Sequence, residues 1–413
     1  MTISYSRSNV GKLLFGLFLL FCSQSLQILA QDSSADDSTP GATSPASRQF
    51  EPQVGETSGE RRSREWLESR GISFETIYRA EAFSNLRGGT DGKRGGEYLG
   101  SADASLTFDL AKLHIGRGAI VVSGQSLHGQ GINDRKVGAV QAASNLDDVP
   151  FNKLIEAYFT DSILHRRLTF KVGRLYSDAD FNVIENGADF LNSSYGSIPT
   201  VPMPTYPSPQ FGATLWTALT SRISVGAGIY HAQNIDSLDE SASPVSTGTF
   251  TILETKVDPF SRAAAFHGSY RVGVWQQGKS TWNANNLLTP VRTYGVYGTG
   301  DHWFRKPLSS GGNVGPGVFF QVGWSPSDRN EIKSYWGVGA AYPGFVPTRS
   351  NDSIGIGVTQ ARLAVGRETV VEAYYKIQLT KRVFVQPDAQ WVNRPAGDGH
   401  DALLGGLRLG VSF

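Results

Sequence analysis

The stretch EAYYKIQLTKRVFVQPDAQWVNRP, residues 372–395, and the final LLGGLRLGVSF, residues 403–413, both alternate apolar with polar side chains. Ala373 and Tyr375 share one phase of the alternation, whereas Glu372 occupies the other. Period two sustained over about ten residues is the pattern of a tilted strand long enough to cross a bilayer. A half-buried strand of a soluble β-sandwich has the same period, so the alternation alone leaves both structures open.

The length of the strands and the last residue of the chain favour a membrane barrel over a soluble β-sandwich. The strands run longer than the ~5–6 residues usual in globular sheets, and the chain ends within a strand at Phe413, an aromatic terminus typical of outer-membrane barrels. A tight turn at 380–381 and a longer loop over 393–401 fit the short turns and long loops of such barrels. We expect thirteen further strands, beginning near Ile72, Tyr98, Ala119, Leu154, Leu168, Phe211, Ile223, Phe250, Ala264, Val291, Val318, Ile332 and Ile354, and hence an all-β, closed antiparallel barrel of about 16 strands.

The amino-terminal region has a different character. Residues 1–30 combine basic residues, an apolar run and a small residue at Ala30, which predicts a cleaved signal peptide. Residues 31–60 are rich in Ser, Asp, Gly, Pro and Thr and read as a flexible linker. Residues 61–71 predict a short periplasmic helix ended by Gly71, and the barrel then occupies 72–413.

Composition excludes several classes of protein. The 413 residues carry 38 basic and 37 acidic side chains, so nothing suggests a nucleic-acid partner. The single cysteine, Cys22, lies in the signal, which excludes a disulfide-stapled fold. The seven histidines have no metal-ligand spacing, and Ser126 with His128 lacks the second glycine of a nucleophile motif. We therefore expect no metal, no cofactor and no enzymatic activity.

One loop has spacings that resemble a calcium site. Asp178, Asp180, Asn182 and Asp189 fall at positions 1, 3, 5 and 12, but Val183 stands where the turn needs glycine. A polar loop is the better interpretation. This stretch, continued through FLNSSYG at 190–196, is also a candidate to fold inward and narrow a pore.

Several blocks in order resemble the carbohydrate-selective porin family of outer-membrane proteins. The pattern near the end comprises Glu372, Tyr375, Gln386-Pro387-Asp388, Gln390, Gly406 and Arg408. The family's usual Trp-Gly-Gly opening is absent from this sequence. Further matching blocks are REWLESRGISFE at 64–75, residues 98–128, FLNSSYG at 190–196, GVFFQVGWSPSDRNEI at 317–332 and PGFVPTRSNDSIGIG at 343–357.

The resemblance implies passive diffusion of mono- or small oligosaccharides across the outer membrane of a Gram-negative cell. Expected partners are small sugars, the bilayer with its lipopolysaccharide, and the barrel-assembly machinery acting on the strand that ends at Phe413; a homo-oligomer stays open. A porin for another solute is the main alternative, and an outer-membrane hydrolase or a soluble sugar-binding β-sandwich is less well supported. Within each predicted strand, one phase of the alternation should face the lumen, which we call lumen parity. The candidate pore-lining residues at lumen parity are Glu156, Arg174, Arg271, Trp275, Glu372, Gln386, Asp388, Gln390 and Arg408.

Overall fold

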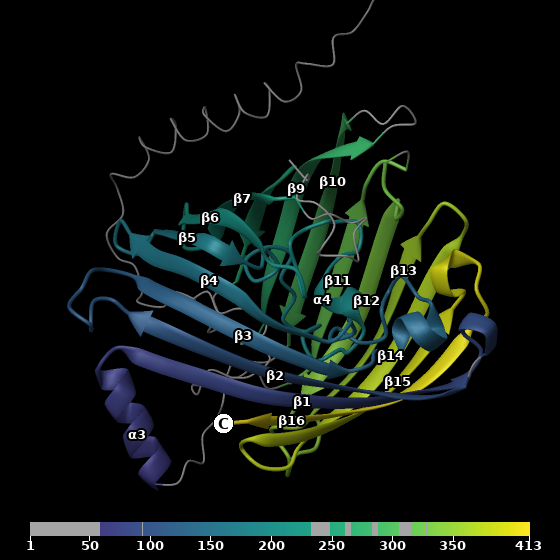
Figure 1. Ribbon diagram of the computed structural model, residues 1–413, viewed down its shortest axis with the longest axis horizontal. Helices are drawn as coiled ribbons and strands as arrows, with labels where there is room; N and C mark the ends of the chain where they lie inside the picture. The colour runs from purple at the N-terminus through teal and green to yellow at the C-terminus, as the bar shows by residue number, and fades with distance from the viewer. Residues whose placement is uncertain are drawn as a thin grey trace, which may run out of the picture.

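The chain forms a closed antiparallel β-barrel of 16 strands in the computed structural model (Figure 1). The structure describes residues 58–92, 94–232, 248–260, 266–282, 288–304, 315–327 and 329–413. Each strand pairs with its neighbours in sequence, and β1 (Ile72–Arg87) closes the barrel against β16 (Ala402–Ser412). Among the described residues, no helix is long and apolar enough to cross a membrane.

The remaining elements follow in simple up-and-down order. A helix, α3 (Ser58–Ser69), precedes the barrel, and short helical turns lie in four loops: η1 (Thr90–Gly92), η2 (Asn133–Val137), α4 (Ser193–Gly196) and η3 (Pro395–Gly397). The other strands are β2 (Gly95–Asp109), β3 (Ala119–Gly129), β4 (Phe151–Ile163), β5 (Leu168–Leu175), β6 (Gln210–Ala218), β7 (Ile223–His231), β8 (Thr249–Val257), β9 (His267–Trp282), β10 (Leu288–Trp303), β11 (Gly317–Trp324), β12 (Ser334–Pro343), β13 (Ser353–Arg362), β14 (Arg367–Gln378) and β15 (Val383–Asn393).

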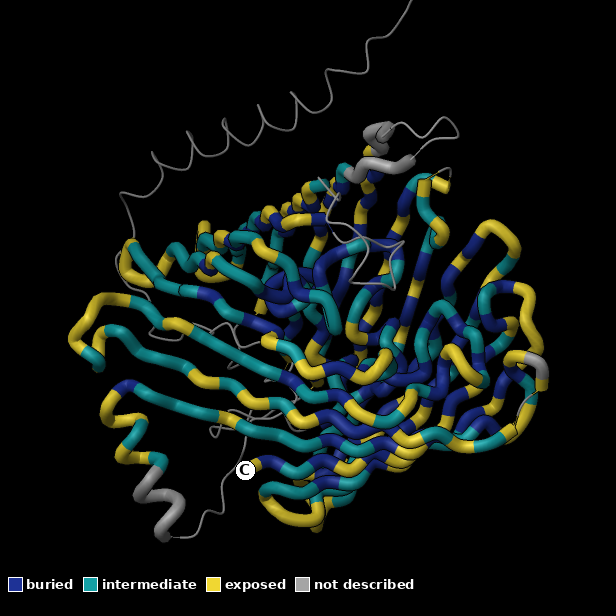
Figure 2. The backbone as a smooth tube through the Cα atoms, viewed as in Figure 1, coloured by how far each residue is buried: buried dark blue, intermediate teal, exposed yellow. Residues whose placement is uncertain are grey.

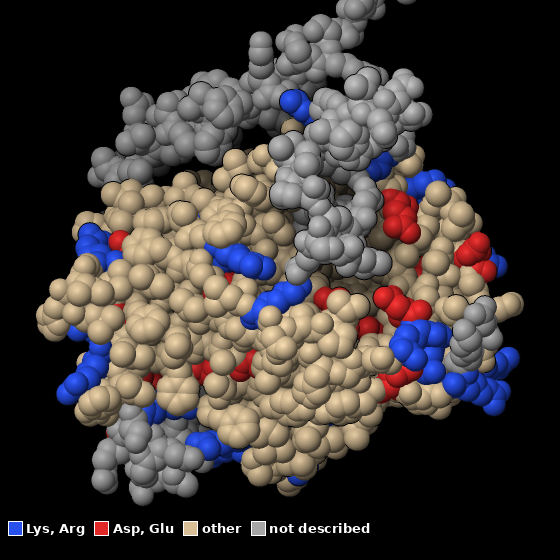
Figure 3. Space-filling view, in the orientation of Figure 1, with Lys and Arg blue, Asp and Glu red and all other residues tan. Residues whose placement is uncertain are grey.

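The predicted strands and the barrel are confirmed. Each of the thirteen upstream strands begins within three residues of its expected position. The period-two alternation separates two environments, as β11 shows with strictly alternating buried and exposed residues (Figure 2). Its exposed positions are Val318, Phe320, Val322 and Trp324. Uncharged side chains make up most of the face seen in Figure 3, so the outer surface suits a bilayer.

The two ends of the barrel differ. At the end where the chain terminates, strands are joined by short turns such as 164–167 and 379–382, and α3 lies beside the start of β1 (Figure 1). Arg64 Nη2 donates to the main-chain oxygen of Phe413 at 3.0 Å, which ties the helix to the last strand. Short turns mark the periplasmic end of an outer-membrane barrel.

The domain boundaries agree with the sequence only in part. The helix predicted over 61–71 spans 58–69, so residues 58–60 belong to it and not to the linker. Gly71 follows with a φ of 83°, the left-handed conformation that favours glycine after a helix. The predicted signal peptide, and the linker up to residue 57, lie outside the described residues.

Two long connections from the opposite end fold into the barrel. The β3–β4 connection spans 130–150, and the β5–β6 connection spans 176–209 and carries α4. Phe190 and Tyr195 of the second connection are buried, with ring centroids 4.3 Å apart, and Phe190 meets Tyr374 of β14 edge-on at 4.9 Å. The expectation that this stretch folds inward is therefore confirmed.

Candidate functional site

Carboxylates on the barrel wall hold the β5–β6 connection in place. Glu372 of β14 accepts hydrogen bonds from the backbone N–H groups of Leu191 at 2.6 Å and Asn192 at 3.0 Å. Asp301 of β10 accepts two more, from Glu185 at 2.8 Å and Asn186 at 2.9 Å. A carboxylate that receives consecutive N–H donors satisfies backbone groups that would otherwise be buried without partners.

The β3–β4 connection is held in the same manner. Glu368 of β14 accepts from the backbone N–H groups of Val140 at 2.9 Å and Gln141 at 2.8 Å. Ser144 donates to Glu81 of β1 at 2.6 Å. Both connections are therefore fixed by hydrogen bonds to β1, β10 and β14, and they narrow the lumen.

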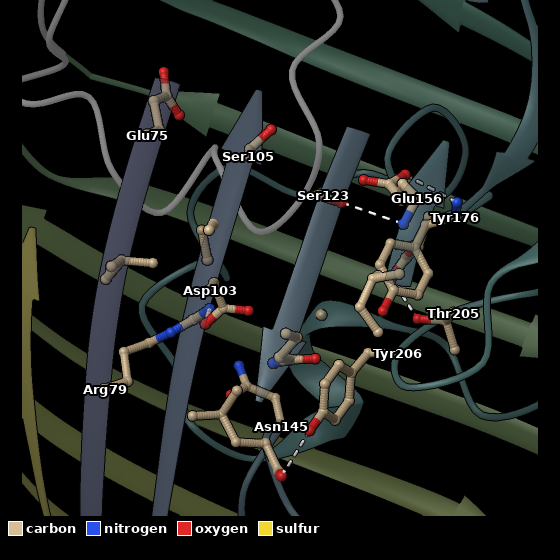
Figure 4. A pocket seen from close by; sticks show the side chains of 18 of the residues that line it. Glu75, Arg79, Asp103, Ser105, Ser123, Asn145, Glu156, Tyr176, Thr205 and Tyr206 are labelled. Carbon is tan, nitrogen blue, oxygen red and sulfur yellow. Dashed lines mark hydrogen bonds and ion pairs between the residues drawn. The ribbon is translucent and has the colours of Figure 1, made fainter. Parts of the chain in front are cut away.

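A cavity of about 620 Å³ remains between these connections and β1–β4 (Figure 4). It reaches the short-turn end of the barrel, where Arg382 and Phe413 border it, and extends to the inward-folded connections. Its polar and aromatic lining includes Glu75, Arg79, Asp103, Ser105, Ser123, Gln125, Asn145, Asp147, Glu156, Tyr158, Tyr176, Asp178, Thr205 and Tyr206.

A chain of polar contacts runs across the wall of this cavity. Arg79 Nη2 on β1 lies 2.8 Å from Asp103 Oδ2 on β2, and Figure 4 shows the two side chains pointing toward each other. Ser101 also donates to Asp103 at 2.8 Å, and Gln125 of β3 donates to Ser101 at 2.8 Å. The register places the four groups side by side, because Arg79 pairs with Ser101 and Asp103 with Gln125.

The inward connections supply the facing side. Tyr206 donates its hydroxyl to the Leu146 carbonyl at 3.0 Å, so its ring joins the two connections at the cavity edge. Glu156 of β4 accepts from the backbone N–H of Tyr176 at 3.2 Å, and Thr205 donates to Asp178. The cavity thus presents hydroxyl, carboxylate and guanidinium groups beside aromatic rings.

Two loop carboxyls in the cavity have altered acidity. Burial raises the pKa of Asp147 to about 7, although a hydrogen bond from the backbone N–H of Asn133 favours its charged form. Burial also raises the pKa of Asp178 to about 7, against a hydrogen bond from Thr205. Both groups therefore change charge near neutral pH.

Of the nine sequence candidates, Glu156 lines the cavity and most of the others contact the inward connections or each other. Gln386 donates to the Asp189 carbonyl at 2.6 Å. Gln390 donates to the Ala143 carbonyl at 2.8 Å and to Asp388 at 3.0 Å. Glu372 holds residues 191–192 as described above. A direct role of these side chains in binding sugar stays a prediction.

Three further candidates lie in ion pairs or aromatic packing. Arg408 pairs with Glu81 and also donates to Asn145 at 2.6 Å. Arg271 pairs with Glu254 at 2.6 Å. Trp275 is 3% exposed and stacks on Phe250 with centroids 6.3 Å apart.

The structure corrects the expected orientation of Arg174. This residue pairs with Ala157 of β4 and Phe211 of β6, and Phe211 is 64% exposed on the outer face. The inward-facing cation of β5 is Lys171, which is buried against Asp180 at 2.8 Å. Arg174 therefore shares the outward phase of Val172.

The sequence candidates omitted Arg79 and Asp103, which form the ion pair on the cavity wall. The period-two alternation could have identified Arg79 and Asp103 as lumen-facing. Arg79 shares the phase of Glu81, and Asp103 stands between Ala102 and Ala104. Nothing local indicates that this side of the lumen stays open. That property depends on where the two long connections fold.

The fold and cavity define a class of protein. A closed barrel with an apolar outer face, a polar interior and connections that narrow its lumen is a porin of the outer membrane. Residues 93–413 match the family described as "Carbohydrate-selective porin, OprB family", and the chain belongs to this family. Within the described ranges, no group of three or more His, Cys, Asp or Glu side chains is placed to hold a metal ion.

Named relatives and solved structures agree with this assignment. The chain is 22% identical to Porin B of Pseudomonas aeruginosa over 90% of its own length and 94% of that protein. The structure of Pseudomonas putida OprB at high pH superposes with a TM-score of 0.74 at 18% identity, covering 85% of this chain and 96% of that one. The low-pH structure of the same protein gives a TM-score of 0.59 at 17% identity, with coverages of 88% and 100%.

Proposed function

We propose that mono- and small oligosaccharides pass through the cavity beside β1–β4, and that the Arg79–Asp103 pair is part of the selective surface. The observation that carries the proposal is the combination of this pair with tyrosine rings along the same cavity. Sugars offer hydroxyl groups that exchange hydrogen bonds with charged partners, and apolar ring faces that contact aromatic side chains. The opposite charges nearly cancel, which weakens the preference for either ion.

The passage needs no catalytic step. We propose a passive channel that solutes cross down their concentration gradient. We also propose that the barrel-assembly machinery recognises the terminal strand ending at Phe413, and that lipopolysaccharide surrounds the barrel in the outer leaflet. The short turns, the last strand and the apolar outer face support this arrangement.

Removing the positive charge and removing the negative charge of the pair should shift the ion preference of the channel in opposite directions. Arg79→Gln leaves Asp103 unbalanced and should shift the reversal potential toward cation selectivity. Asp103→Asn leaves Arg79 unbalanced and should shift it toward anions. Both variants should also weaken the block of ion current by maltose in planar bilayers, because each loses a group that exchanges hydrogen bonds with hydroxyls.

Arg349→Gln provides the control. Arg349 is also paired, with its Nε 2.5 Å from Asp352 Oδ2, but it lies on the β12–β13 turn outside the cavity lining. It should leave the reversal potential and the maltose block close to wild type. If Arg79→Gln and Asp103→Asn left the reversal potential and the maltose block unchanged, the proposed route would be wrong. If no sugar gave a saturable block of the ion current, a general diffusion pore would be favoured.

The ion preference of the wild-type channel should depend on pH. Because the pKa values of Asp147 and Asp178 are raised to about 7, both carboxyls are neutral in acid and become negative as the pH rises through that value. Cation selectivity should therefore increase between roughly pH 6 and pH 8. Reversal potentials across a KCl gradient measure the shift, and the double variant Asp147→Asn, Asp178→Asn should flatten it. A flat wild-type profile would contradict the prediction.

A further inference from the structure

One corner of the cavity holds acidic groups on β4 and at the start of the β5–β6 connection. This carboxylate corner consists of Glu156, Tyr176 and Asp178, all of which line the cavity. Figure 4 shows Glu156 and Tyr176. Tyr176 is 5% exposed. Its hydroxyl and Asp178 Oδ1 are buried and have no hydrogen-bond partner among the residues that the structure describes. Buried polar atoms of this kind are normally satisfied, so a ligand or water that enters the cavity has two atoms to bind.

The charge balance around the corner is negative. The nearby cations of the wall are engaged elsewhere, since Lys171 Nζ lies 2.8 Å from Asp180 and Arg79 Nη2 lies 2.8 Å from Asp103. Arg64 and Arg382 border the cavity at the end formed by Phe413. Burial, together with the negative charges of Glu156 and Asp180, raises the pKa of Asp178.

We propose that the carboxylate corner is a subsite for the protonated amine of an amino sugar. An ammonium group can donate to Asp178 Oδ1 and to the Tyr176 hydroxyl oxygen, and Glu156 adds a second negative charge. The rings of Tyr158 and Tyr206, which also line the cavity, offer surfaces for the sugar ring and for a cation. A neutral sugar can still exchange hydroxyl hydrogen bonds here, whereas the carboxylate of an acidic sugar would be repelled.

The inference rests on the proposed route, and the test separates the two. Glucosamine, N-acetylglucosamine and glucuronate would be titrated against single channels at about pH 7. Glucosamine and N-acetylglucosamine share a ring and differ in the acetyl group, which converts the charged amine into a neutral amide. We expect glucosamine to block half the ion current at a concentration roughly fivefold below that of N-acetylglucosamine, and glucuronate to block least.

Two variants of the corner and one control complete the experiment. Asp178→Asn should bring the ratio of the two half-blocking concentrations close to one, and Tyr176→Phe, which removes only a hydroxyl, should reduce it in part. Asp134→Asn makes the same change on an exposed residue outside the lining and should keep the wild-type ratio. Heat-modifiable mobility on gels confirms that each variant is folded.

The possible outcomes are distinct. Equal block by glucosamine and N-acetylglucosamine in the wild type would overturn the amine subsite while leaving the sugar route intact. A wild-type preference that persists unchanged in folded Asp178→Asn and Tyr176→Phe would also overturn it. Absence of block by every sugar would instead overturn the proposed route itself.

Discussion

Replacing Leu407 by arginine should destabilise the barrel by roughly 2–4 kcal/mol, the cost of a cation facing lipid near the bilayer midplane. Leu407 stands in the middle of β16, opposite Ala82 of β1 and Pro387 of β15, and it is 47% exposed on the outer face. Its neighbours offer no carboxylate to pair with the new charge. Denaturant titration of protein refolded into lipid vesicles would measure the loss.

Leu403→Arg is the matched control for this prediction. Leu403 has the same side chain on the same face of β16, at 42% exposure, but it lies next to the loop over 394–401. The cost of arginine falls to ~0–1 kcal/mol near the interface, so this variant should be much closer to wild type. Equal losses for the two variants would contradict the assigned depth. Gly406 is unsuitable as an inward control, because a Cβ there would come within 2.3 Å of the Phe83 ring.

The barrel could be predicted because its signal is local. Each strand carries the period-two pattern in its own residues, and the final three strands show it most clearly. Glu372, Gln386 and Arg408 were assigned to the lumen by this parity, and all three are buried inside the barrel. The alternation within one strand does not depend on distant residues. The sequence of each strand therefore predicts which of its side chains face the lumen.

Arg174 shows where parity was misread. In LTFKVGRL at 168–175, the apolar residues Leu168, Phe170 and Val172 share the phase of Arg174, whereas Lys171 occupies the other phase. Arg174 became a candidate as a lumen-parity residue, but the apolar residues that share its phase place it on the outer face. Arg174 stands one residue before the end of β5, where a long side chain can extend its charged group toward the interface.

The open part of the lumen could not be predicted from local patterns. Glu372 binds backbone groups of residues about 180 positions away in sequence, and no periodicity encodes such a contact. Many hydrogen bonds of this kind, made by both connections, together determine which strands the connections cover. The sequence therefore predicts lumen-facing residues, but it does not separate those that hold a connection from those that border the cavity.

Glu372→Ala tests whether these anchors keep the pore narrow, and it should produce a large functional change. The backbone N–H groups of Leu191 and Asn192 would lose their acceptor in a site where Glu372 is fully buried. Each buried donor left without a partner costs about 1–3 kcal/mol, so the segment around α4 should detach from β14 while the strands stay paired. Glu331→Ala, an exposed glutamate of the β11–β12 loop, is the control and should behave as wild type.

Detachment of this segment should have three measurable effects. Single-channel conductance should rise, because part of the lumen now filled by the β5–β6 connection becomes open to ions. Block by maltose should weaken, since Tyr206 and Thr205 belong to the same connection and would lose their fixed positions at the cavity edge. Limited proteolysis should cut within 176–209 in the variant and not in wild type. A folded Glu372→Ala protein with unchanged conductance and unchanged maltose block would show that the remaining contacts, including those of Asp301 with Glu185 and Asn186, hold the connection without this carboxylate.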